Sequence, residues 1–341
     1  MALKLSVLDQ SPIHDDKEPK SGLSDTIELA KLCEDLGYYR YWCAEHHDTP
    51  GYASAAPEIM VGAVANATSS IKVGSGGVML NHYSPYKVAE VFNMLSALHS
   101  PRIDLGIGRA NGANFLSARA LHNQNSENYL LKAQDLVNYL NDTIPENDYF
   151  YGVGLSPKDV DPTPVYLLGS SEASSDLAGK LGAGFCLALF IGTHDRPKEI
   201  MDIYKRYFKA SKTFDKPKPM IAVACICADS LVEAKKIAST HTYWKVQAFR
   251  HPVRDPLHSP KEVVELYEEL DHYDKEYFHE TMDSMVLGTP QECKAQIEAL
   301  AQEYGVDEVM IVNVTYSFED RKRSYELLAK EFNLDNNKER K

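Results

Sequence analysis

The sequence predicts an α/β protein with the (β/α)8 barrel fold, in which eight parallel strands alternate with helices. Short apolar, β-branched runs alternate with segments of helical apolar spacing along most of the chain. Residues 71–112 read as strand, helix and strand in direct succession, which is a βαβ unit. The length of 341 residues suits one large barrel with insertions. A doubly wound sheet is the alternative arrangement.

The first half of the barrel is expected to supply four strands, and the helices between them have recognisable faces and ends. The helix predicted over residues 24–36 carries an apolar stripe that includes Leu29 and Leu36, and Gly37 follows as a favourable stop. A helical region is predicted to follow Gly112 and to reach about Leu140. The expected strands are residues 3–9, 39–44, 71–80 and 103–107, and the helices between them include residues 24–36 and 58–68.

The second half is expected to supply four more strands, at residues 165–168, 184–190, 220–228 and 308–313. Thr289 and Glu292 form a capping-box pattern with proline between them, which predicts a helix start. Residues 141–163 and 250–286 fit the repeat poorly and are predicted to be insertions before strand 5 and before strand 8. The second insertion is a candidate cover for the active site. The whole chain, 1–341, is expected to be one barrel domain.

Composition narrows the class of protein. The net charge of −13 and the pI of about 5.4 argue against a nucleic-acid binder or a basic protein of membrane surfaces. No apolar run is long enough to span a bilayer and no signal peptide is visible, so a cytoplasmic protein is expected. The six cysteines contain no CxxC pair and are expected to be buried, reduced thiols. No set of ligands indicates a metal site.

Candidate functional residues follow the strands, because ligands of parallel α/β folds bind at the carboxyl ends of strands. His46, in the triplet Glu45-His46-His47, follows the second strand and suits a general base near neutral pH. The same histidines could instead form a structural pair in the barrel rim. Gly76 and Gly77 lie near the end of the third strand, where glycine lets a flat ligand approach the backbone.

A phosphate site is the second candidate. Arg109 follows the fourth strand and offers a fork of donors, and Ser170 and Ser171 follow the fifth strand at a helix start. Serine at a helix start also serves as an N-cap, so simple capping is the alternative. The glycines from Gly106 to Gly112 do not have the GxGxxG spacing of a dinucleotide fingerprint.

At these residues the sequence resembles the bacterial luciferase-like flavin monooxygenase family, in its single-chain branch. The matching pieces occur in family order along nearly the whole chain. They are residues 5–12 (LSVLDQSP), 44–47 (AEHH), 53–57 (ASAAP), 73–80 (VGSGGVML), 102–109 (RIDLGIGR), 167–171 (LLGSS) and 323–328 (RSYELL).

The resemblance implies a (β/α)8 barrel that binds FMN, with its phosphate on Arg109, Ser170, Ser171 and Ser174. The flavin ring would lie against Gly76 and Gly77, where relatives often have a non-proline cis peptide. His46 matches the histidine regarded as the base in luciferases. Reduced FMN, supplied by a separate NAD(P)H-dependent reductase, would react with O2 and an unidentified small organic substrate. Pairing of luciferase barrels implies a homodimer through the second and third helices.

One departure from the family and three alternatives stand beside this interpretation. Close relatives usually read Ala-Pro-Gly, then a polar residue and an aspartate, after the arginine. This chain reads Ala-Asn-Gly-Ala-Asn over residues 110–114, and the loss of the proline and of the acid bears on substrate choice and flavin affinity. The protein could bind flavin without catalysis. It could be a barrel enzyme that acts on a phosphorylated metabolite without flavin. A deazaflavin-dependent reductase of the same superfamily is a further variant.

Overall fold

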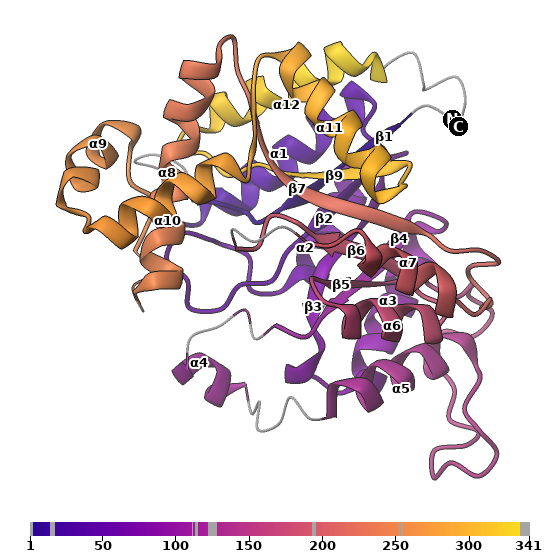
Figure 1. Cartoon of the computed structure of the whole chain (residues 1–341). Coiled ribbons are helices and arrows are strands. Elements are labelled where there is room, and N and C mark those ends of the chain that lie inside the picture. The colour runs from indigo at the N-terminus through magenta and orange to yellow at the C-terminus, as the bar shows by residue number, and fades with distance from the viewer. Residues whose placement is uncertain are drawn as a thin grey trace.

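A computed structural model provides the structure of this chain (Figure 1). It describes residues 3–13, 18–110, 112, 115–121, 128–192, 196–251, 253 and 255–334.

Eight parallel strands close into a barrel, as the sequence predicts. Each strand pairs with the next, and β7 closes the ring by pairing with both β6 and β9. The strands of the barrel are β1 (Lys4–Asp9), β2 (Arg40–Cys43), β3 (Lys72–Met79), β4 (Ile103–Gly108), β5 (Val165–Gly169), β6 (Gly184–Ala188), β7 (Pro219–Cys227) and β9 (Glu308–Val312). All of these pairs are parallel, so every strand ends at the same rim.

Helices follow the strands and cover the barrel. The helices are α1 (Ser21–Leu36), α2 (Pro57–Ala67), η1 (Leu80–His82), α3 (Pro85–His99), α4 (Phe115–Ala120), α5 (Tyr129–Asn141), α6 (Glu172–Lys180), α7 (Glu199–Tyr207), α8 (Leu231–Arg250), α9 (Pro260–Glu269), α10 (His272–Asp283), α11 (Pro290–Tyr304) and α12 (Phe318–Phe332). Two helix ends have the predicted caps. Thr289 and Glu292 form the capping box at the start of α11, and Gly37 ends α1 in a left-handed conformation.

The two predicted insertions differ in structure. Residues 142–164 form neither helix nor strand. Residues 250–286, in contrast, contain α9 and α10, which pack against α8 on the left side of Figure 1. The segment ends in a ninth strand, β8 (Val286–Gly288), which pairs with the last residues of β7. The barrel has its eight predicted strands, and β8 is an additional strand that the sequence did not predict, because three residues are too few for a strand pattern to be recognised.

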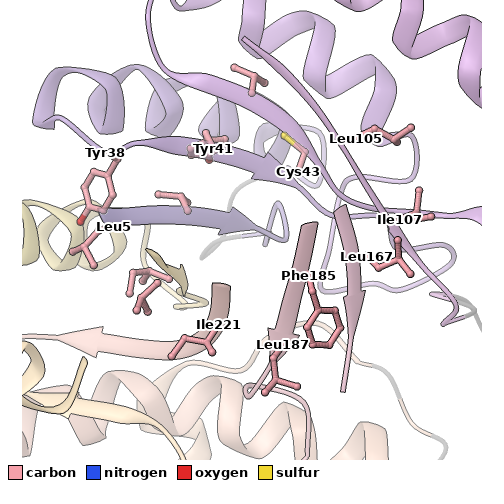
Figure 2. Close-up of a cluster of buried hydrophobic side chains, with 14 of the residues drawn as sticks. Leu5, Tyr38, Tyr41, Cys43, Leu105, Ile107, Leu167, Phe185, Leu187 and Ile221 are labelled. Atoms are coloured by element: carbon pink, nitrogen blue, oxygen red, sulfur yellow. The ribbon is translucent and has the colours of Figure 1, made fainter. Parts of the chain in front are cut away.

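Apolar side chains fill both faces of the barrel wall. Leu8 and Trp42 belong to a cluster inside the barrel, whereas their chain neighbours Val7 and Tyr41 belong to the layer between strands and helices. Figure 2 shows part of this outer layer. Its labelled residues are Leu5, Tyr38, Tyr41, Cys43, Leu105, Ile107, Leu167, Phe185, Leu187 and Ile221. All six cysteines are free and buried, as predicted.

A buried group of charges lies where the strands begin. Arg40 Nη1 donates to Asp104 Oδ2 at 2.6 Å, and Arg40 Nε donates to Glu308 Oε1 at 2.5 Å. Ser6 Oγ donates to the same Glu308 oxygen at 2.6 Å. Burial opposes the charge of Arg40, but Glu308 and Asp104 hold its pKa well above its usual range. This buried ion group lies at the end of the barrel opposite the expected site.

Among the described residues, no helix is long and apolar enough to cross a membrane. The same part of the chain contains no group of three or more histidine, cysteine, aspartate or glutamate side chains that could hold a metal ion.

Candidate active site

Glu45 organises the loop that follows β2. Its side chain is fully buried, and Oε1 accepts a hydrogen bond from Tyr83 Oη at 2.8 Å and lies 2.7 Å from His47 Nε2. Its Oε2 accepts from the backbone N–H of Met79 at 2.9 Å. The carboxylate therefore fixes the loop after β2 to the end of β3, and His47 has a structural partner. The two histidines of the triplet thus have different surroundings.

His46 is the histidine that borders open space. Its backbone N–H donates to the carbonyl of Ser54 at 2.9 Å, and its ring stacks on Tyr52 with centroids 4.6 Å apart. His46, Tyr52 and Ala53 line a hollow of about 570 Å³, whose lining also includes Ile13, Pro19, Lys20, Leu23 and Pro256. The half-buried ring can therefore meet a small molecule, as a general base must.

A second set of residues reaches this rim from α8, nearly 200 positions later in the chain. His241 Nε2 lies 3.2 Å from Tyr52 Oη, and the rings of Trp244 and Tyr52 meet edge to face at 5.1 Å. Lys245 Nζ donates to the carbonyl of Phe190, just after β6, at 2.7 Å. Sequence reasoning missed all of these residues. One sequence feature could have indicated them: His241 and Lys245 are polar residues four positions apart, so a helix places both on the same face, and that face is buried.

Burial controls the charges of this α8 group. Burial, together with neighbouring Lys245 and His46, holds the pKa of His241 well below its usual range, so the imidazole is neutral at pH 7. Burial also lowers the pKa of Lys245 to about 8. No carboxylate among the described residues forms an ion pair with either side chain.

Arg109 and Ser170 follow the ends of two neighbouring strands. Gly108 of β4 pairs with Leu168 of β5, so the next residues of both strands leave the barrel together. Asn81 Nδ2 donates to the backbone carbonyl oxygen of Arg109 at 3.1 Å, so the backbone is held in place there. The side chain of Arg109 is exposed. An exposed guanidinium after one strand and a helix N-terminus after the neighbouring strand are both groups that can attract an anion.

Ser171 and Ser174 both cap α6. Ser171 is the N-cap residue and its hydroxyl accepts from the N–H of Ser174 at 3.4 Å, while Ser174 Oγ donates to the carbonyl of Ser171 at 2.7 Å. The two hydroxyls therefore have the capping role that the sequence left open. Because the cap uses Ser171 Oγ as an acceptor, its O–H can still donate to an anion, as can the Ser170 hydroxyl, whereas the Ser174 O–H is already donated to the carbonyl of Ser171.

Gly76 and Gly77 lie within β3, and the peptide bond between them is cis. A Cβ atom on Gly76 would collide with Leu8 Cδ1 and lie 3.0 Å from Trp42 Cβ, and one on Gly77 would lie 2.8 Å from the carbonyl oxygen of Gly106. Packing within the barrel therefore requires both glycines whether or not a ligand is bound. Of the loop that departs from the family pattern, Asn111, Ala113 and Asn114 lie outside the described residues.

Solved structures of low sequence identity share the fold. The oxygenating constituent of 3,6-diketocamphane monooxygenase from Pseudomonas putida, in complex with FMN, has a TM-score of 0.70 at 18% identity and covers 97% of this chain and 98% of its own. An F420-dependent secondary alcohol dehydrogenase, in complex with an F420–acetone adduct, has a TM-score of 0.67 at 16% identity, covering 98% and 99%.

Comparisons at higher identity define the family. The profile of luciferase-like monooxygenases matches residues 3–308. N-acetyl-S-alkylcysteine monooxygenase of Bacillus subtilis is 32% identical over 334 residues, which are 96% of this chain and 97% of that protein. The crystal structure of apo-MsnO8 has a TM-score of 0.86 at 36% identity and covers 98% of both chains. The chain therefore belongs to the luciferase-like monooxygenase family.

Proposed function

We propose that this protein is an FMN-dependent monooxygenase that uses reduced FMN and O2 to oxidise a small organic substrate. The observation that carries this proposal is the position of Arg109 and Ser170 after the neighbouring strands β4 and β5, with Gly76 and Gly77 on the next strand of the same barrel. This set matches the phosphate and ring contacts that the family resemblance implies. Reduced FMN would come from a separate NAD(P)H-dependent reductase.

The residues present suit FMN. The guanidinium of Arg109 is exposed after β4, and the N-terminus of α6, nine residues long, follows the neighbouring strand β5, so both would favour a phosphate dianion. Ser170 and Ser171 would add hydroxyl contacts, whereas the Ser174 O–H would first have to release the carbonyl of Ser171. The backbone at Gly76 and Gly77 has no side chain that would keep a planar ring away.

Bound reduced FMN would supply the electrons that activate O2. The residues of the chain would bind, orient and protect the reactants: His46 would accept or donate a proton beside the substrate, and the apolar rim of Tyr52, Trp244 and Leu257 would exclude water. The relative that acts on N-acetyl-S-alkylcysteines makes these thioethers the first compounds to screen.

Titration with FMN tests the cofactor assignment. Arg109→Gln should weaken FMN binding by about 10- to 100-fold, because it removes a charged hydrogen bond to phosphate. Riboflavin, which lacks the phosphate, should bind both proteins equally. Arg206→Gln, in the last turn of α7, is the matched control and should bind FMN like the wild type.

Three results would contradict the proposal. Unchanged FMN affinity of Arg109→Gln would remove the phosphate assignment. A wild-type protein that binds neither oxidised nor reduced FMN would remove the cofactor, and preferential binding of F420 would assign a deazaflavin instead. Tight FMN binding without any oxygen-dependent product would favour a flavin-binding protein that is not an oxygenase.

We also propose a homodimer that uses α2 and α3. Of the apolar stripe on α3, Val88 is buried and Val91 and Leu95 pack against the core, so these residues are part of the barrel. Ile59 on α2 and Leu98 on α3 are instead 69% and 72% exposed. Such a pair of exposed apolar side chains on adjacent helices suits a second copy of the same surface.

Leu98→Asp should convert the dimer to a monomer, because it would bury a charge without a partner in the interface. Sedimentation velocity would measure the change in mass. Val264→Asp, which alters an equally exposed side chain on α9, should leave the dimer intact. A wild-type protein that sediments as a monomer would contradict this assignment.

A further inference from the structure

We propose that Tyr52 and His241 are positioning residues for His46, through which α8 fixes the orientation of the base. The inference rests on the proposed function, because it assigns His46 a proton-transfer role. The contact between Tyr52 and His241 connects the loop after β2 to α8, which lies far away in the sequence.

The ring of His46 stacks on the ring of Tyr52. The two rings lie 4.6 Å apart with an interplanar angle of 24°, so one face of the imidazole is covered. The backbone N–H of His46 is held by the carbonyl of Ser54, in the same loop as Tyr52. Rotation of the His46 ring therefore requires Tyr52 to move as well.

Tyr52 is in turn held by His241 of α8. Its hydroxyl lies 3.2 Å from Nε2 of His241, whose side chain is buried. Because His241 is neutral, Nε2 can accept the phenolic proton, and Tyr52 Oη then acts as donor. The rings of Trp244 and Tyr52 also meet edge to face, with centroids 5.1 Å apart. Tyr52 is thus held between His46 and α8.

Side-chain hydrogen bonds hold α8 itself in place. Trp244 Nε1 donates to the carbonyl of Asp255 at 3.0 Å, and Thr240 Oγ1 donates to the carbonyl of His258 at 2.9 Å. Lys245 Nζ donates to the carbonyl of Phe190 at 2.7 Å. These bonds attach the helix to the segment before α9 and to the end of β6, so that His241 has a fixed position relative to the rim.

The experiment compares Tyr52→Leu, Tyr52→Phe, His241→Leu and His241→Gln. Tyr52→Leu removes the stack, Tyr52→Phe removes only the hydroxyl, and His241→Gln keeps an acceptor where His241→Leu does not. Tyr243→Phe is the matched control, because it removes a hydroxyl from the same helix without contact to His46. Thermal unfolding would identify any variant that fails to fold.

The first readout needs no flavin. The ring protons of His46, assigned in NMR spectra by comparison with His46→Gln, should be shifted upfield by the Tyr52 ring in the wild type. They should return to ordinary positions in Tyr52→Leu, change in His241→Leu, and stay near the wild-type positions in His241→Gln and Tyr243→Phe. Unchanged His46 signals in Tyr52→Leu would overturn the proposal.

The second readout is turnover with reduced FMN and a substrate found by screening. Tyr52→Leu should lower kcat by up to about 100-fold, the scale of losses from misplaced catalytic groups, with little change in KM. Tyr52→Phe should lower kcat by about 2- to 10-fold, and His241→Gln should recover most of the loss seen in His241→Leu. Changes confined to KM would contradict the proposal, since they would indicate a substrate contact.

The two readouts also separate this inference from the proposed function. If the wild-type protein turns over no substrate and binds no FMN, the proposed function fails whatever the NMR spectra show. If wild-type turnover is normal but Tyr52→Leu retains both its kcat and its His46 signals, the function stands and the positioning role is wrong.

Discussion

His46→Gln is expected to turn over its substrate about 100- to 10,000-fold more slowly than the wild type, which is the range for removal of a positioned acid or base. Glutamine approximates the size of histidine and can still hydrogen-bond, but it cannot carry the proton. FMN affinity should stay within about twofold, because Arg109 and the α6 N-terminus, which lie at other strand ends, would supply the phosphate contacts. Single-turnover mixing of protein, reduced FMN and aerated substrate measures both quantities.

His99→Gln serves as the control for this prediction, because His99 is in the last turn of α3, away from the strand ends. Full turnover by His46→Gln would mean that another group moves the proton. A loss of FMN binding together with turnover would instead assign His46 a structural role. The prediction thus separates chemistry from binding.

The sequence predicted the barrel well, because its signals are local and repeat along the chain. Apolar runs and helix ends such as Gly37 depend on neighbours within one or two turns. The sequence did not predict the short strand β8. It predicted the segment that contains α9 and α10 only as an insertion, without helices. The start of α9 does have a local signal, a capping box of Ser259 and Glu262 with proline between them, which the sequence analysis did not use, and both helices pack against α8.

The site could be predicted only in part, for a related reason. Arg109, Ser170 and His46 follow strands directly, and the topology alone places such residues at one rim. Tyr52 and His241 have no such marker, since their contact joins residues 189 positions apart. The choice between phosphate binding and capping at Ser171 also depended on hydroxyl directions that a sequence does not contain.

Arg40→Met is expected to lower the free energy of unfolding by about 3–5 kcal/mol, the usual result of breaking a buried ion group from one side. Arg40, Asp104 and Glu308 are all almost completely buried at the start of the barrel. Removal of the guanidinium leaves two carboxylates close together without a counter-charge. Urea unfolding followed by circular dichroism, with the slope checked for constancy, measures the change.

Two further variants test whether the loss of stability in Arg40→Met comes from the buried charges. Arg323→Met, which breaks an exposed pair with Asp229, should cost no more than about 1 kcal/mol. Replacing Arg40, Asp104 and Glu308 together with apolar residues of similar volume should recover much of the loss, because no charge then remains to be desolvated. A loss below about 1 kcal/mol in Arg40→Met would mean that water reaches these carboxylates. Failure of the triple variant to recover would instead show that the barrel needs this ion group for its packing, and not only for charge balance.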